Sequence, residues 1–381
     1  MRLLFFIYSL SGGGGERVTA NLANNWAAKG WDITIVTLTP LSLDFYELHP
    51  KVRRIALDLA GDSRNVFVGF WKNMRRVKAL RRVLQQIHPD IALALMSTAN
   101  VILALASWGL PEVRAIGSER TFPPQVPLGT LWEALRRNTY GRLAAVVALT
   151  GESAEWLKTE TFARRVPIIP NAAPWPLPAQ APRIPIIAFC SAKRHVLLAV
   201  GRLSSEKNYE VLLDVFSQLA RAHPDWDLVI LGEGPERPAL ESKVQAARLD
   251  GRVFLPGRAG NVGEWYERAE LYVMSSHFEG FPNTLAEAMA HGVPAVAFDC
   301  DTGPRDIIRH DVDGLLISPG NLLSLKSALD RLMGDTALRV QFAARAGEAR
   351  ERFSMERIAG MWEELFSEVS RDRTRTRNLA R

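Results

Sequence analysis

The chain has 381 residues, of which 47% are hydrophobic and 23% are charged. This length fits two domains, and this composition is typical of a globular protein rather than a disordered or disulfide-rich one. Cys190 and Cys300 lie in apolar stretches, which indicates buried thiols, and no apolar run reaches the roughly 18 residues of a membrane-spanning helix. The net charge of +6 combines a basic first half, an acidic second half and an arginine-rich tail, so we expect an anionic partner.

The first apolar run, residues 3–9, matches either the core of a signal peptide or a buried strand. It precedes four glycines, residues 12–15, and an amphipathic pattern that ends at Gly30. A signal peptide would instead end at a small-residue cleavage site, so we expect a strand followed by a helix. The glycines would let backbone N–H groups approach an anion, or they form a flexible turn. Arg17 and Val18 exclude the dinucleotide-binding G-x-G-x-x-G pattern.

Further strand-like runs alternate with helical patterns along the whole chain, which predicts two doubly wound α/β domains. We expect the strands of the first half at residues 3–9, 32–38, 53–59, 90–95, 113–117, 144–150 and 166–170, and those of the second half at residues 195–201, 226–232, 252–257, 270–276, 294–298 and 313–319. A proline-rich stretch divides the halves. The predicted organisation is a first domain, a linker, a second domain and a C-terminal helix with a basic tail, at residues 1–175, 176–194, 195–355 and 356–381.

Two stretches of the second half contain the residues best suited to chemistry. In residues 200–216, Arg202 and Lys207 flank one strand-to-helix turn, so both cations can converge on a diphosphate. In residues 275–298, Glu279 lies in a loop and Glu287 in the following helix. Carboxylates suit sugar hydroxyls, and the N–H groups at the helix start suit an anion.

These stretches, "GRLSSEK" and "FEGFPNTLAEAMAHGVPAVA" with its Glu-x7-Glu spacing, resemble the retaining glycosyltransferases of family 4. The resemblance covers nearly the whole chain. It implies the GT-B fold, in which two Rossmann-like domains face a central cleft and the C-terminal helix crosses back to the first domain. It also implies that Arg202 and Lys207 neutralise the diphosphate of a nucleotide sugar, that Glu279 holds the transferred sugar and that Glu287 binds the ribose. The other donor-binding residues that it implies are Gly14, Gly15, Pro256, Gly257, Gly280, Phe281, Pro282, Asn283, Thr284 and Leu285.

On the acceptor side the resemblance points to Gly13 and Glu16 of the glycine loop. Many relatives have a histidine after the fourth or fifth strand, where this chain has Met96 and, after it, Ser97, Thr98 and Asn100. This pattern, together with "GSERTFPP", resembles the branch that builds lipid-linked oligosaccharides and exopolysaccharides. Glu119 and Arg120 line the acceptor site or form a buried structural ion pair.

No metal or cofactor is expected, because two fixed cations can stabilise the leaving diphosphate. Asp311 and Asp313 resemble a metal-binding pair, but their sequence favours a turn. The basic amphipathic segment 68–87 either lies on anionic lipid or packs on the core with a solvated basic face. The arginine tail would assist lipid binding or be disordered.

The expected function is retaining transfer of a hexose or N-acetylhexosamine from a nucleotide sugar, a UDP-sugar, to a polyprenyl-diphosphate-linked saccharide in exopolysaccharide, O-antigen or related glycan synthesis. The expected location is cytoplasmic, peripheral on the inner face of the cytoplasmic membrane. The alternatives are another donor such as a GDP-sugar, a soluble acceptor, or a phosphorylase or epimerase of the same fold. A nucleic-acid-binding protein is a further alternative, but it leaves Glu279 and Glu287 unexplained.

Overall fold

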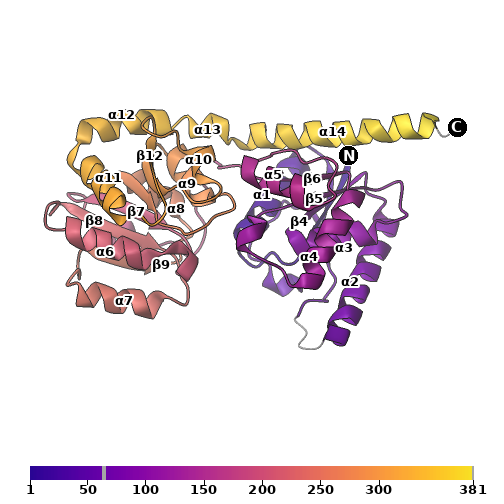
Figure 1. The fold of residues 1–381 in the computed structure, drawn as a ribbon, viewed down its shortest axis with the longest axis horizontal. Helices are drawn as coiled ribbons and strands as arrows, with labels where there is room; N and C mark the ends of the chain where they lie inside the picture. The colour runs from indigo at the N-terminus through magenta and orange to yellow at the C-terminus, as the bar shows by residue number, and fades with distance from the viewer. Residues whose placement is uncertain (62–65, 380–381) are drawn as a thin grey trace. The chain divides into compact units, whose positions relative to one another are not determined.

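The computed structural model describes residues 1–61 and 66–379. The chain divides into two compact units, of which the first contains residues 1–171 and 355–381 and the second contains residues 172–354. Figure 1 shows the helices and strands of each unit. Each unit is built around its own parallel sheet.

The first unit has a six-stranded sheet in the order β3-β2-β1-β4-β5-β6. All neighbouring strands are parallel, with Phe5 of the central strand opposite Ile35 and Leu93. Both faces of a parallel sheet are covered by helices, which explains why these strands are continuous apolar runs. The strands are β1 (Arg2–Ile7), β2 (Asp32–Thr37), β3 (Arg53–Ala56), β4 (Ile91–Leu95), β5 (Arg114–Ser118) and β6 (Ala145–Val147).

Alternate residues of β1 pack on opposite faces of this sheet. Leu4 and Phe6 belong to a core cluster with residues of α2 and α3. Phe5 stacks instead on Trp26 of α1, with ring centroids 6.0 Å apart. The helices of this unit are α1 (Gly14–Ala28), α2 (Val66–Ile87), α3 (Ser97–Ala106), α4 (Thr130–Thr139), α5 (Gly151–Glu160) and α14 (Met355–Leu379).

The C-terminal helix α14 packs on the first unit, as expected (Figure 1). Phe366 lies 5.4 Å from the Trp26 ring, and Glu363 accepts hydrogen bonds from Trp26 Nε1 and from Lys29 Nζ, both at 2.8 Å. The helix continues through the arginine-rich tail to Leu379, and residues 380–381 lie outside the described residues.

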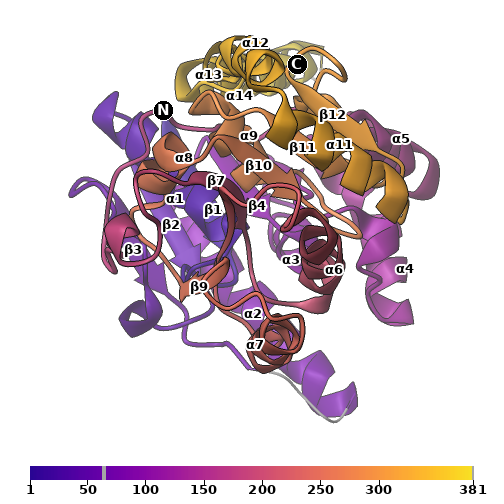
Figure 2. The same cartoon turned by 90° about the vertical axis from the view of Figure 1, so that its left-hand side faces the viewer.

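The second unit has a six-stranded parallel sheet in the order β12-β11-β10-β7-β8-β9. Helices α6, α7 and α11 cover one face in a common core cluster, and α8 and α9 contact the strands as well (Figure 2). The strands are β7 (His195–Val200), β8 (Trp226–Leu231), β9 (Val253–Gly257), β10 (Leu271–Met274), β11 (Ala295–Phe298) and β12 (Gly314–Ile317). The helices are α6 (Tyr209–Leu219), α7 (Arg237–Ala246), α8 (Val262–Arg268), α9 (Asn283–Ala290), α10 (Pro304–Ile307), α11 (Leu322–Gly334), α12 (Thr336–Ala346) and α13 (Ala349–Arg352).

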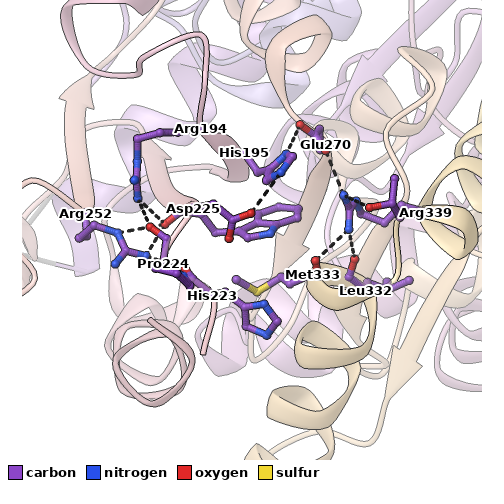
Figure 3. A network of polar contacts seen from close by, with 12 residues as sticks. Arg194, His195, His223, Pro224, Asp225, Arg252, Glu270, Leu332, Met333 and Arg339 are labelled. Carbon is purple, nitrogen blue, oxygen red and sulfur yellow. Dashed lines mark hydrogen bonds and ion pairs between the residues drawn. The ribbon is translucent and has the colours of Figure 1, made fainter. Parts of the chain in front are cut away.

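A polar network joins the amino ends of β7, β8 and β10 in this unit (Figure 3). His195 Nδ1 lies 2.5 Å from Glu270 Oε1, and Arg339 contacts the other oxygen of the same carboxylate at 3.3 Å. Asp227 pairs with Arg194 at 2.6 Å and with Arg252 at 3.3 Å. These contacts connect the starts of β7, β8 and β10 at the amino edge of the sheet.

The segment 166–170 was predicted as a strand, and this prediction is wrong. The segment contributes only one isolated bridge, between Ala148 and Ile168. Pro167 and Pro170 have no N–H group to donate to a neighbouring strand, which prevents a continuous ladder. Of the thirteen predicted strands this one is absent, whereas the other twelve form the two sheets.

The two cysteines are free and buried, as predicted. Burial raises the pKa of the Cys190 thiol to about 11 and that of the Cys300 thiol to about 12. Within residues 1–61 and 66–379, no helix is both long and apolar enough to cross a membrane.

Candidate functional site

The loops at the carboxyl ends of β7 and β8 approach each other closely. Gly232, which follows β8, has a φ of +147°, and a Cβ atom there would lie 1.8 Å from the Gly201 carbonyl oxygen. Gly257, at the end of β9, accepts a hydrogen bond from the Gly232 N–H at 2.9 Å and has a φ of +102°. Glycine is therefore required at these strand ends, and the predicted residues Pro256 and Gly257 lie beside the β8 loop.

Lys207 and Glu279 form an ion pair at this edge of the second sheet. Lys207 Nζ donates to Glu279 Oε1 at 2.6 Å, and Ser276 Oγ donates to the same oxygen at 2.7 Å. Ser275 Oγ also donates to the Lys207 carbonyl at 2.9 Å. The loop after β10 thus holds both the backbone of the lysine and its charged partner.

The backbone of the Glu279 loop is fixed by the loop after β11. The buried Thr302 hydroxyl donates to the Glu279 carbonyl. Gly303 has a φ of +98°, and a Cβ atom there would lie 2.5 Å from Pro282 Cδ. On its other side Phe281 packs edge-on against Phe353, with centroids 5.5 Å apart. Gly280 to Asn283 therefore form a tightly held turn that leads into α9.

Glu287 lies on α9 and is 2% exposed. The hydroxyl of buried Tyr266 donates to its Oε2 at 3.3 Å. One turn earlier, the Tyr272 hydroxyl donates to Thr284 Oγ1 at 2.8 Å, and burial raises the pKa of Tyr272. Leu285 is fully buried, so its side chain belongs to the core.

Arg202 differs from Lys207 in its surroundings. Its side chain is exposed and makes no hydrogen bond or ion pair with another described residue. The turn between them contains a short 3-10 helix, Ser205–Lys207, and Asn208 in the left-handed conformation. The two cations therefore flank one turn as predicted, with only Lys207 already paired.

In the first unit, Gly13 precedes α1, and Glu16 folds back over it. Ser9 Oγ donates to Glu16 Oε1 at 2.8 Å, and a Cβ atom on Gly13 would lie 2.1 Å from Glu16 Oε2. Tyr46 donates to the Gly13 carbonyl at 2.9 Å. A Cβ atom at position 13 would displace the end of the Glu16 side chain, and Gly14 and Gly15 begin the helix.

The predicted acceptor residues near β5 form a buried cluster. Ser97 Oγ donates to Glu119 Oε2 at 2.7 Å, and the Tyr140 hydroxyl donates to the other oxygen. Burial raises the pKa of Glu119. Asn100 donates to the Tyr140 hydroxyl of this cluster at 3.2 Å. It also joins α3 to β5, because it accepts from the Ser118 N–H at 3.0 Å and donates to the Ser118 carbonyl at 3.1 Å. Thr98 is half-buried on α3.

Glu119 and Arg120 are both buried, but they are not paired with each other. Arg120 Nη1 donates to Asn171 Oδ1 at 2.5 Å, and the guanidinium lies 6.0 Å from the Trp362 ring centroid. Burial lowers the pKa of Arg120 to about 9. Both residues are therefore buried, as the predicted structural ion pair required, but they do not form that ion pair with each other.

Met96 immediately precedes α3 and has a φ of +85°, a conformation that is strained for a side chain of this size. Its sulfur would lie 3.4 Å from a Cβ atom on Gly15. The strained residue therefore lies against the glycine loop, at the position where the sequence lacks the expected histidine.

The Asp311 to Asp313 segment is a turn, as favoured by its sequence. Buried Asp313 accepts hydrogen bonds from the Arg309 N–H at 2.7 Å and from Arg309 Nε at 2.6 Å. Across the part of the chain that the structure describes, no group of three or more His, Cys, Asp and Glu residues is arranged to hold a metal ion.

Sequence reasoning missed Tyr266, Tyr272 and Thr302. A signal existed for Tyr272, since it interrupts an aliphatic strand and a buried tyrosine hydroxyl needs a partner. No short-range pattern connects Thr302 to Glu279, because the two lie in loops after different strands.

Comparison with known proteins agrees with this architecture. A family model described as "Glycosyltransferase Family 4" matches residues 12–174, and one described as "Glycosyl transferases group 1" matches residues 188–349. An exopolysaccharide phosphotransferase of Streptomyces coelicolor is 35% identical over 79% of this chain, which spans only 31% of that relative's length.

Two other proteins resemble the chain over nearly its full length. One is a Campylobacter jejuni protein, 26% identical over 97% of this chain and 99% of its own, named GalNAc-alpha-(1->4)-GalNAc-alpha-(1->3)-diNAcBac-PP-undecaprenol alpha-1,4-N-acetyl-D-galactosaminyltransferase. The other is Anabaena HepE, solved in complex with UDP, with a TM-score of 0.78 at 20% identity over 97% of this chain and 100% of that chain. The matches to both halves and the two parallel sheets identify the chain as a GT-B glycosyltransferase of the family 4 type.

Proposed function

We propose that this protein is a retaining glycosyltransferase that moves a hexose or N-acetylhexosamine from a UDP-sugar to a lipid-linked saccharide. The observation that carries this proposal is the Lys207 and Glu279 pair, 2.6 Å apart, with buried Glu287 on the helix that follows. A cation, a half-buried loop and a buried carboxylate lie at the carboxyl edge of a doubly wound sheet, where ligands of such sheets bind.

The donor diphosphate would bind the two cations at this edge. Cleavage of the bond between the sugar and the diphosphate leaves negative charge on the departing oxygen, which fixed cations stabilise. Exposed Arg202 is available to a phosphate, and Lys207 would exchange its carboxylate partner for one. We therefore propose that catalysis needs no divalent metal.

The two glutamates would recognise the two sugars of the donor. Glu287 would accept hydrogen bonds from the ribose hydroxyls, with the Tyr266 hydroxyl fixing its orientation. Glu279 and the turn from Gly280 to Thr284 would hold the transferred sugar. The complex of Anabaena HepE with UDP supports a uridine nucleotide as the donor group.

The acceptor would be a polyprenyl-diphosphate-linked saccharide, which is the kind of substrate named for the Campylobacter jejuni relative. Gly13, Glu16, Ser97, Thr98, Glu119 and Arg120 would belong to the acceptor side. A Glu119 carboxyl that keeps its proton would act as a hydrogen-bond donor as well as an acceptor toward a sugar hydroxyl.

The confinement of such an acceptor to a membrane would favour peripheral attachment at the inner face of the cytoplasmic membrane. Helix α2 packs on the core of the first unit and also has exposed aromatic and basic residues. Leu80 and Leu84 are buried in the core, and Phe70 and Trp71 at its start are exposed. Arg76 donates to loop carbonyls, whereas Arg75, Lys78 and Arg82 are exposed and available to anionic headgroups.

The test is calorimetric titration of the purified protein with UDP and with GDP in EDTA, alongside Arg202→Ala and Lys207→Met. We expect metal-independent binding of UDP that both variants weaken. Preference for GDP would support the alternative donor. Failure to bind either nucleotide would refute the donor site.

A further inference from the structure

Tyr209 is a buried tyrosine whose hydroxyl has no hydrogen-bond partner among the residues that the structure describes. It is the first residue of α6, it is 5% exposed, and its ring belongs to the core cluster of the second unit. Its hydroxyl makes no hydrogen bond with any described residue, and the hydroxyl oxygen is not completely covered by protein atoms. Buried polar groups normally have a partner, so this free hydroxyl requires an explanation.

The neighbouring buried tyrosines show the usual arrangement. The Tyr272 hydroxyl donates to Thr284 Oγ1 at 2.8 Å, and the Tyr266 hydroxyl donates to Glu287 Oε2 at 3.3 Å. The three tyrosines lie on α8, β10 and α6 of the second unit. Tyr209 alone among them leaves its hydrogen-bonding capacity for another molecule.

The position of this hydroxyl is defined by Gly201. A Cβ atom built on Gly201 would lie 2.6 Å from the Tyr209 oxygen and 3.4 Å from Lys207 Cε. The absence of a side chain at position 201 therefore leaves room for the phenol and the lysine arm side by side. The same lysine ends in the ammonium that pairs with Glu279.

The surroundings keep this phenol protonated. Burial raises the pKa of Tyr209 well above its usual range, and Tyr272, Glu279 and Glu206 raise it further. At neutral pH the group is therefore a neutral O–H donor beside a cation. A donor and a cation next to each other suit an anionic oxygen that accepts from both.

We propose that the Tyr209 hydroxyl donates a hydrogen bond to a diphosphate oxygen of the nucleotide sugar that Lys207 binds. This inference rests on the proposed donor site and adds a residue to it. It also explains why Gly201 has no side chain, since any Cβ atom there would displace the phenol.

The test is Tyr209→Phe, which removes one oxygen and leaves the ring in the core. Because a hydrogen bond to a charged group is removed, we expect UDP affinity to fall by about tenfold or more in calorimetry. Because no protein group loses a partner, the urea midpoint of unfolding should stay at the wild-type value or rise. A lowered midpoint would overturn the inference, since the hydroxyl would then have a structural role.

Lys207→Met distinguishes failure of this inference from failure of the donor site. If Lys207→Met loses UDP affinity and Tyr209→Phe keeps it, Tyr209 is not a diphosphate ligand and the donor site remains. If UDP affinity is kept in Tyr209→Phe but UDP-sugar affinity falls, the hydroxyl binds the sugar, and the inference as stated is wrong. If the wild-type protein does not bind UDP, both proposals fail together.

Discussion

Replacement of Glu279 by glutamine should strengthen UDP binding while it slows sugar transfer. In the structure the Lys207 ammonium is engaged by Glu279 at 2.6 Å. A diphosphate must therefore displace this carboxylate before it can use the lysine. Glutamine keeps the shape of the side chain and can still accept from Ser276, but it removes the competing charge.

The size of the effect follows from the exposure of the pair. A hydrogen bond to a charged group contributes about 1.5 to 3 kcal/mol. The Lys207 side chain is 21% exposed and that of Glu279 is 12% exposed, so solvent screens the pair in part. We therefore expect a gain of about 1 to 2 kcal/mol, which is about a fivefold to thirtyfold increase in UDP affinity.

Calorimetry with UDP at fixed ionic strength measures this gain directly. Glu264→Gln is the matched control, because Glu264 pairs with Arg183 at 2.6 Å on an exposed surface and should leave UDP affinity unchanged. Sugar transfer by Glu279→Gln should fall, since the variant loses a proposed ligand of the transferred sugar. UDP binding that is unchanged or weaker in Glu279→Gln would refute the exchange of Lys207 between carboxylate and diphosphate.

Three further predictions concern other parts of the chain. Glu287→Ala should weaken UDP binding about tenfold and abolish the preference for UDP over 2′-deoxy-UDP, as measured by calorimetry, because the ribose loses its carboxylate. Burial raises the pKa of Glu119 above its ordinary value of 4.5, so the folded protein binds this proton more tightly than the unfolded chain does and loses stability as the pH rises above that value. Urea titrations should therefore show that Glu119→Gln gains stability relative to the wild type between pH 4.5 and pH 7. Trp71→Ser should lower sedimentation with anionic vesicles, whereas Trp108→Ser, at 65% exposure against 64% for Trp71, should not.

Most of the fold was predictable because the strands are buried on both faces and therefore differ from the helices in pattern. The prediction of a strand at 166–170 was wrong because the apolar residues of this segment match the strand pattern, whereas its two prolines prevent a continuous ladder of hydrogen bonds. Lys207 and Glu279 were identified as separate motifs, but their pairing depends on the adjacency of β7 and β10, which are neighbours only in the folded sheet.

The buried partners of the site were less accessible to sequence reasoning. Tyr266 reaches Glu287 from α8, and Thr302 reaches Glu279 from the loop after β11. Such contacts join residues 21 and 23 positions apart and have no periodicity that a local pattern can express. Arg120 was identified, but its partner Asn171 lies 51 positions away and is not the charged residue next to it.

The second unit separates the charges that stabilise its fold from those that are available to a ligand. At the amino edge of the sheet, Glu270 is shared by His195 and Arg339 (Figure 3). Asp227 is shared by Arg194 and Arg252. These pairs join the starts of the strands to one another and to α12, so their removal should lower the stability of the fold.

At the carboxyl edge the charges are less fully satisfied. Arg202 is exposed, Lys207 has a carboxylate that a phosphate can replace, and the Tyr209 hydroxyl makes no hydrogen bond with another described residue. The ion pairs at the amino edge hold the strand starts, and the buried parallel strands connect that edge to the carboxyl edge. The groups at the carboxyl edge can therefore be positioned by the sheet and do not need to pair with protein groups. Substitutions at the two edges should therefore have different effects. His195→Ala should lower the urea midpoint of unfolding and leave UDP affinity unchanged, whereas Tyr209→Phe should lower UDP affinity without lowering the urea midpoint.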